Sequence, residues 1–103
     1  MNMLQLALLV GKRQAIVGLV VENAFDAPDA DGYIADTAGA VRGAHAVHVV
    51  AWVDNAWVPR SAPRASGGYF IVKNSWGRTY GDGGYAYVPV EWLRRNMLDI
   101  ILI

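Results

Sequence analysis

GGYFIVKNSWGRTYGDGG, from Gly67 to Gly84, is the most informative stretch of the sequence. Its apolar run from Tyr69 to Val72 is short and uninterrupted, which is typical of a buried strand. The chain then enters a loop that contains the amide side chain of Asn74, two aromatic residues and several glycines. Because polar side chains on a loop beside a rigid strand often form functional sites, we expect a site where this strand ends.

Other segments on both sides of this stretch are predicted as strands. Strands are expected at residues 15–22, 44–54, 69–74, 85–88 and 98–103, a helix at residues 2–10 and a helical turn at residues 90–95. Gly18 lies inside the first strand and indicates a bulge or a close approach to the backbone. In strand 44–54, alternation places His45, Val47 and Val49 on one face, and His48, Val50 and Trp52 on the other.

The remaining segments are predicted as connections. Residues 23–43 are rich in Asp, Ala, Gly and Pro and show little periodicity, so we expect a long connection with a short strand around Tyr33. Residues 55–66, which contain two prolines, are predicted to form a surface loop.

Length and composition limit the fold to one domain with one core. The 103 residues are 54% hydrophobic and 17% charged, against about 45–50% and about 25% in soluble domains. This excess of apolar residues favours either a tightly packed β-rich domain or a piece whose apolar face packs against another segment. We favour the second interpretation, because the sequence contains no cysteine. The motifs described below imply that a cysteine lies in another segment.

Charge and cysteine content exclude several classes of function. Nine basic and nine acidic residues give a net charge of zero, so we expect neither a nucleic-acid partner nor binding to an anionic membrane. The apolar segment of residues 3–10 is too short for a membrane span and poorly built for a signal peptide, so no compartment is indicated. The lack of cysteine excludes disulfides and a thiol nucleophile, and we expect no metal and no cofactor because His45, His48 and Asp54 lack zinc-site spacing.

Two motifs resemble papain-like cysteine proteases. YFIVKNSWG at residues 69–77, followed by YGDGGY at residues 80–85, is similar to the family's asparagine segment. His45-Ala46-Val47 stands where the family has its catalytic histidine at the start of a strand. The resemblance covers nearly the whole chain and implies an α+β fold with an antiparallel, partly barrel-like sheet and an N-terminal helix.

The resemblance also implies the roles of individual residues. A cysteine thiolate attacks the peptide carbonyl, His45 pairs with it and protonates the leaving amine, Asn74 orients the imidazole, and Trp76 covers their contact. The family's cysteine lies in an N-terminal half, so residues 1–103 are expected to be a single partial domain, the C-terminal half. The implied partners are a peptide or protein substrate and the missing cysteine-bearing half, and the isolated chain is expected to be inactive.

Substrate-binding residues are implied by the same alignment. Gly18, Ala44 and Ala46 would line the pocket for the substrate side chain second from the scissile bond, and their small size indicates a roomy apolar pocket. Tyr80 stands where the family commonly has a second tryptophan on the leaving-group side of the cleft. Ala51 and Gln14 also depart from the family pattern, in place of a glycine and a proline.

Two alternatives remain open. The chain is either part of a peptidase, as a gene fragment or one chain of a two-chain enzyme, or a non-catalytic binding module derived from the family. A third interpretation is an unrelated β-rich domain, which would be supported by a structure with His45 and Asn74 far apart.

Overall fold

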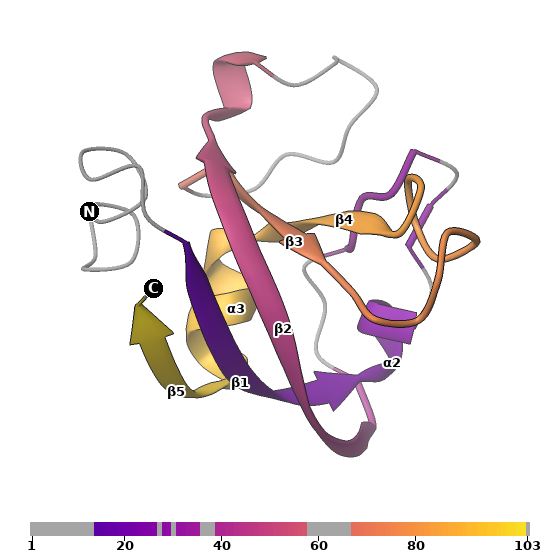
Figure 1. The fold of residues 1–103 in the computed structure, drawn as a ribbon, viewed down its shortest axis with the longest axis vertical. Helices are drawn as coiled ribbons and strands as arrows, with labels where there is room; N and C mark the ends of the chain where they lie inside the picture. Colours follow the sequence, from indigo (N-terminus) through magenta and orange to yellow (C-terminus); the bar gives the residue numbers. More distant parts are fainter. Residues whose placement is uncertain (1–13, 27, 30, 36–38, 58–66, 103) are drawn as a thin grey trace.

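A computed structural model describes residues 14–26, 28–29, 31–35, 39–57 and 67–102. In this part of the chain, an antiparallel five-stranded sheet is combined with short helices (Figure 1). The sheet has the order β4-β3-β2-β1-β5, so β4 and β5 are its edges and it is not closed. The strands are β1 (Ala15–Glu22), β2 (Val41–Val53), β3 (Tyr69–Lys73), β4 (Tyr85–Pro89) and β5 (Met97–Leu102).

The α+β class with an antiparallel sheet is therefore confirmed, and every predicted strand corresponds to a strand of the structure within a few residues. The predicted helix at residues 2–10 lies outside the described residues.

The main core lies on one face of the sheet, where α3 (Val90–Asn96) packs behind the strands (Figure 1). Alternation along β1 buries Val17 and Leu19 and leaves their neighbours half-buried, as expected for a strand with one face against a core. Pro89 ends β4 and precedes α3, because proline has no N–H for the ladder but fits before a helix. Helix α3 contributes Trp92 and Leu93 to this core.

A bulge in β2 overturns the predicted facing of Trp52. The pairing of β2 with β3 shifts between Val49 and Ala51, so two residues of β2 stand against one step of β3. Trp52 consequently pairs with Phe70 and packs against the main core, the side on which Val49 is buried. Strict alternation had placed Trp52 on the opposite face, and this prediction was wrong because one extra residue reverses the facing of all residues after it.

The connection before β2 has more structure than predicted. Its first residues form the one-turn helix α2 (Asn23–Asp26), which buries Phe25. The expected short strand around Tyr33 is an isolated bridge to Tyr87, flanked by a hydrogen bond from Ile34 N to Tyr87 O of 3.0 Å. Tyr33, Tyr69 and Tyr87 form a small second cluster on the face of the sheet away from the main core.

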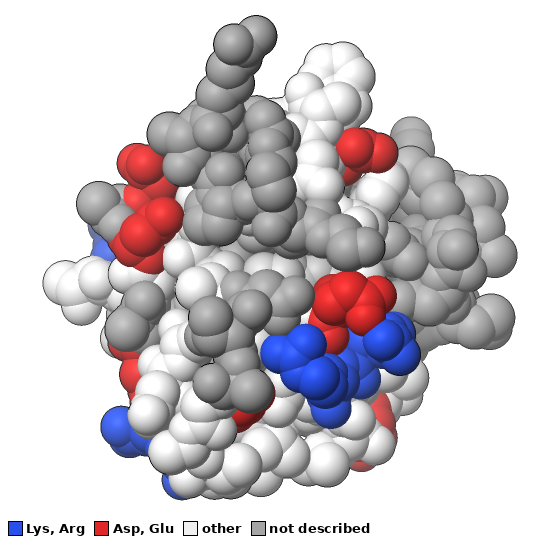
Figure 2. Space-filling model, turned by 180° about the vertical axis from the view of Figure 1, so that it is seen from behind, with Lys and Arg blue, Asp and Glu red and all other residues white. Residues whose placement is uncertain are grey.

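The described surface carries mixed charge. Figure 2 shows the basic side chains of one face gathered against acidic ones rather than spread as a field of a single sign. Among the described residues, no helix is long and apolar enough to cross a membrane, and no cluster of three or more His, Cys, Asp or Glu side chains is arranged to hold a metal ion.

Candidate active site

Strand pairing brings His45 and the loop after β3 together. β2 pairs with β3 in antiparallel register, with His48 opposite Lys73. Continued past Lys73, the chain therefore runs beside the residues that precede His48. In the structure, His45 Nε2 lies 2.9 Å from Asn74 Oδ1, a hydrogen-bonding distance. This contact joins two residues that are 29 positions apart in the sequence.

The orientation of the Asn74 amide determines which nitrogen of His45 carries a proton. Asn74 Oδ1 also accepts a hydrogen bond of 2.8 Å from the backbone N–H of Ser75, which identifies this atom as the amide oxygen. Since the oxygen can only accept, His45 Nε2 must donate. In the neutral imidazole, Nδ1 is then unprotonated and available as a base.

The backbone of Asn74 is anchored as firmly as its side chain. Its N–H donates a 3.0 Å hydrogen bond to the carbonyl of Gly84, which closes the loop between β3 and β4. The side chain is only 4% exposed, and no well-directed hydrogen bond reaches its Nδ2 group from the described residues. The oxygen end of the amide is therefore held by hydrogen bonds, while the nitrogen end is buried beside the phenol of Tyr80.

Trp76 covers the contact between His45 and Asn74. Its indole stacks on the His45 ring, with a centroid distance of 5.0 Å and an interplanar angle of 23°, while 43% of the residue stays exposed. Phe25 of α2 meets the indole edge-on at 5.6 Å and stacks on Trp92 at 5.7 Å. A continuous aromatic column thus connects the surface at Trp76 to the main core, and its edge-on and stacked geometries are favourable ones.

Tyr80 is buried in this structure. It is 8% exposed, packs edge-on against Trp76 at 5.2 Å and donates a 2.5 Å hydrogen bond to the carbonyl of Phe25. Burial raises the pKa of its phenol well above the usual value of 10.0, and the nearby Asn74 side chain offsets part of the rise. Tyr80 therefore supports Trp76 from within the protein. Its predicted contact with a substrate is restricted to the small part of the residue that is exposed.

The residues predicted to line a substrate pocket lie on neighbouring strands. Gly18 pairs directly with Ala46 of β2 on one side and with Asp99 of β5 on the other. A Cβ on Gly18 would lie 2.5 Å from Asp99 Oδ1, which agrees with the close approach expected at this glycine. Ala44 lines a pocket together with His45. The role of Gly18, Ala44 and Ala46 in substrate binding stays a prediction, and Asp99 adds a carboxylate where only apolar groups were expected.

His48 takes no part in this arrangement. Its Nε2 lies 2.6 Å from Gln14 Oε1, and it pairs across the sheet with Ile16, while His45 pairs with Leu19. Sequence reasoning missed Phe25, Asp26 and Arg42, which lie around His45. No periodic pattern marks these residues, since α2 is a single turn within a long irregular connection.

Comparison with known proteins agrees with this geometry. A family model described as papain family cysteine protease matches residues 12–96, most of the chain. The chain belongs to the papain family of cysteine proteases. Papain-family membership was predicted from the two motifs and is confirmed, although this member has no cysteine in its sequence.

One solved structure shows the same fold. Xylellain, a cysteine protease from Xylella fastidiosa, matches with a TM-score of 0.70 and 24% sequence identity over 94% of this papain-family chain. The chain spans 34% of the length of xylellain. Among curated proteins, no relative matches.

Proposed function

We propose that this chain forms the histidine- and asparagine-bearing wall of a papain-like active site that hydrolyses peptide bonds. The observation that carries the proposal is the 2.9 Å contact between His45 Nε2 and Asn74 Oδ1 beneath the Trp76 ring. The nucleophilic thiolate would come from a second, cysteine-bearing polypeptide segment, because the sequence has no cysteine. The substrate would be a peptide or protein, and neither nucleic acid nor a membrane is proposed as a partner.

In this proposal His45 moves protons through Nδ1. With Nε2–H held by Asn74, Nδ1 accepts the proton of the thiol, and the thiolate attacks the carbonyl carbon of the substrate. The C–N bond then breaks, and the leaving amine receives the proton from Nδ1. Nδ1 then takes a proton from a water molecule, the hydroxide adds to the acyl carbon, the C–S bond breaks to release the carboxylic acid, and the proton on Nδ1 returns to the thiolate. Trp76 keeps solvent away from the hydrogen bond between His45 and Asn74, which strengthens it.

The test compares the chain alone with the chain mixed with the cysteine-bearing half of a papain-family protease. With a fluorogenic peptide as substrate, the chain alone is expected to show no thiol-dependent cleavage. The mixture is expected to cleave the peptide, to lose this activity with a cysteine-modifying reagent, and to lose it in His45→Ala. His48→Ala is the matched control and is expected to retain activity, since His48 contacts Gln14 and not Asn74.

Thiol-independent cleavage by the chain alone, removed by His45→Ala, would contradict this proposal. Searching the coding sequence upstream for a glutamine followed by a Cys-Trp segment would further distinguish a fragment from a chain that works with a separate partner.

A non-catalytic binding module is the second candidate. Large apolar side chains are exposed on the described surface, among them Leu98 (62%) and Ile101 (63%) on the edge strand β5. Exposed apolar patches of this kind often mark protein interaction sites. For a binding module, substitution of His45 or Asn74 would leave partner binding unchanged, and no cysteine-bearing half would restore cleavage.

A further inference from the structure

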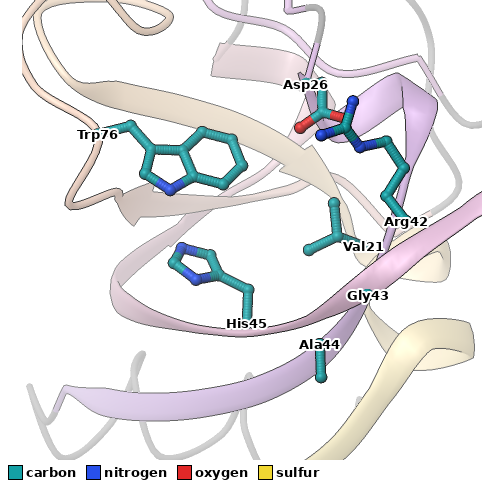
Figure 3. Close-up of a pocket in the computed structure, with 7 residues that line it drawn as sticks. All are labelled: Val21, Asp26, Arg42, Gly43, Ala44, His45 and Trp76. Atoms are coloured by element: carbon teal, nitrogen blue, oxygen red, sulfur yellow. The ribbon is translucent and has the colours of Figure 1, made fainter.

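A small polar pocket includes His45 and Trp76 in its lining, and its two charged residues, Asp26 and Arg42, have no role in the proposal above. It has a volume of about 130 Å³, and its walls come from β1, α2, β2 and the loop that carries Trp76. Figure 3 shows His45 and Trp76 on one side of this pocket, and Arg42 with Asp26 on the other. Any ligand in the pocket would therefore touch both the imidazole side and a charged pair.

The charged pair presents its cation to solvent. Arg42 Nε lies 2.8 Å from Asp26 Oδ2, and the side chains are 60% and 24% exposed, respectively. Asp26 Oδ2 itself is buried and accepts no hydrogen bond within the described residues, so the pair is joined by charge and not by a directed hydrogen bond. Within the described residues, the terminal nitrogens of the Arg42 guanidinium have no partner beyond this single ion pair. Among the residues that the structure describes, Arg42 therefore keeps N–H donors that a ligand can reach.

The surroundings leave Arg42 open to a ligand. It is followed in β2 by Gly43, which has no side chain, and Ala44, which has only a methyl group, and both residues line the same pocket. Asp26 Oδ2 lies 2.8 Å from Arg42 Nε, so this ion pair keeps the positive charge of the guanidinium beside the pocket. A guanidinium matches a carboxylate in shape, because it can donate two parallel N–H···O hydrogen bonds.

We infer that this pocket binds a carboxylate of a peptide ligand through Arg42, next to His45. The inference rests on the proposed function for the presence of a peptide on this face. The carboxylate is either the side chain of an acidic residue or the C-terminal carboxylate of the peptide, since both have the same chemistry. The site then discriminates in favour of acidic peptides and against basic ones, because a basic group would meet the exposed cation.

The test is a binding experiment that needs no catalysis. The full 103-residue chain, labelled with 15N, is titrated with acetyl-Gly-Gly-Glu-amide, acetyl-Gly-Gly-Gly with a free carboxylate, acetyl-Gly-Gly-Gln-amide and acetyl-Gly-Gly-Lys-amide. At least one acidic peptide is expected to shift the indole N–H of Trp76 and the amides of Gly43 and Ala44 with roughly tenfold higher affinity than the Gln peptide. Which acidic peptide binds tells the two sources of the carboxylate apart.

Arg42→Gln is expected to remove the preference for acidic peptides. Arg42→Lys keeps the positive charge beside Asp26 but not the planar set of donors. This variant is expected to retain only part of the preference for acidic peptides. Arg78→Gln is the matched control, because Arg78 lies on the loop between β3 and β4, outside this pocket. This variant is expected to keep the same preference for acidic peptides as the wild type.

Equal or tighter binding of the Gln or Lys peptide, or an unchanged preference in Arg42→Gln, would overturn the inference. A dispersed NMR spectrum of each variant shows that it is folded. Because the readout is binding, a failure of the two-chain mixture to cleave peptides would leave this result standing.

Discussion

Asn74 controls His45 through a single oxygen atom. Asn74 Oδ1 accepts from both His45 Nε2 and the Ser75 N–H, so the amide cannot turn over without losing both hydrogen bonds. The proton of neutral His45 is thereby held on Nε2, and the ring plane is held by Trp76. The state of the imidazole is therefore set by its support before any nucleophile is present.

Removal of the Asn74 side chain is expected to free the His45 tautomer. In Asn74→Ala, Nε2–H loses its acceptor, so 15N chemical shifts of the ring should change from one tautomer to a mixture of two. The loss of both hydrogen bonds to Oδ1 should also lower the free energy of unfolding by about 1–3 kcal/mol. Asn74→Asp is the control, because a carboxylate still accepts from Nε2. A ring that keeps Nε2–H in Asn74→Ala would show that something else sets the tautomer.

The contact between His45 and Asn74 could be expected from residues whose types are unusual in combination, while their catalytic roles stay a prediction. Asn74 and Trp76 lie two positions apart, in a motif that includes its neighbours, and the order of the motifs then pointed to His45. Phe25 and Arg42 could not be found in this way, because their roles depend on how an irregular connection folds back over β2. No periodic pattern records such a return of the chain.

Elements were predicted well where hydrophobicity is continuous and poorly where backbone geometry intervenes. Strands β1, β3 and β5 were located from their apolar runs. The bulge in β2 was not visible, because Val50 has the same apolar character as its neighbours while its extra position reverses the facing of Trp52. The loop between β3 and β4 was recognised as rich in turns, but the sequence did not indicate which of its glycines is most sensitive to substitution.

The structure ranks two of these glycines and predicts unequal effects of alanine at each. Gly81 and Gly83 have nearly the same positive φ, 56° and 60°, so alanine meets a similar backbone penalty of roughly 1–2 kcal/mol at either position. A Cβ at Gly81 would also collide with the carbonyl oxygen of Tyr85, whereas nothing lies within 4 Å of a Cβ at Gly83.

Gly81→Ala should therefore lower the free energy of unfolding by about 1–3 kcal/mol more than Gly83→Ala, since overpacking adds to the backbone strain. Urea unfolding of the two variants measures the difference directly. Equal losses would mean that the loop moves to accommodate the new methyl group and that Tyr85 does not constrain it.

On the scale of the whole molecule, the described surface includes several exposed apolar side chains. The hydrophobic fraction of 54% indicated more apolar side chains than one small core contains, and the edge strand β5 exposes Leu98 and Ile101. An edge strand that exposes apolar side chains can pair with a strand of another chain. In the function proposed above, a cysteine-bearing half would supply the nucleophile, and the apolar excess is a reason to propose that the chain packs against another segment.

Glu22 connects three parts of the molecule and should make its stability depend on pH. Its carboxylate, at the end of β1, accepts a 2.6 Å hydrogen bond from the backbone N–H of Gly39. That hydrogen bond lowers the pKa of Glu22 below the usual 4.5, and Asn96 and Arg95 of α3 lower it further, against the opposing effect of burial. With a lowered pKa in the folded state, the contribution of Glu22 to stability is fully present above 4.5 and is lost as the pH falls through the folded-state pKa.

Glu22→Gln is therefore expected to destabilise the protein near neutral pH. The effect should disappear under acid conditions, because the wild-type carboxyl is then protonated and uncharged like the Gln amide. Urea midpoints for both proteins, measured from neutral pH to below 4.5, should converge as the pH falls. Glu91→Gln is the matched control: the hydrogen bond from Arg94 also lowers the pKa of Glu91, but both side chains of this pair are exposed, so its removal should change the midpoint little at any pH. Parallel curves for wild type and Glu22→Gln would show that protonation of Glu22 does not link β1 to α3 in the folded state.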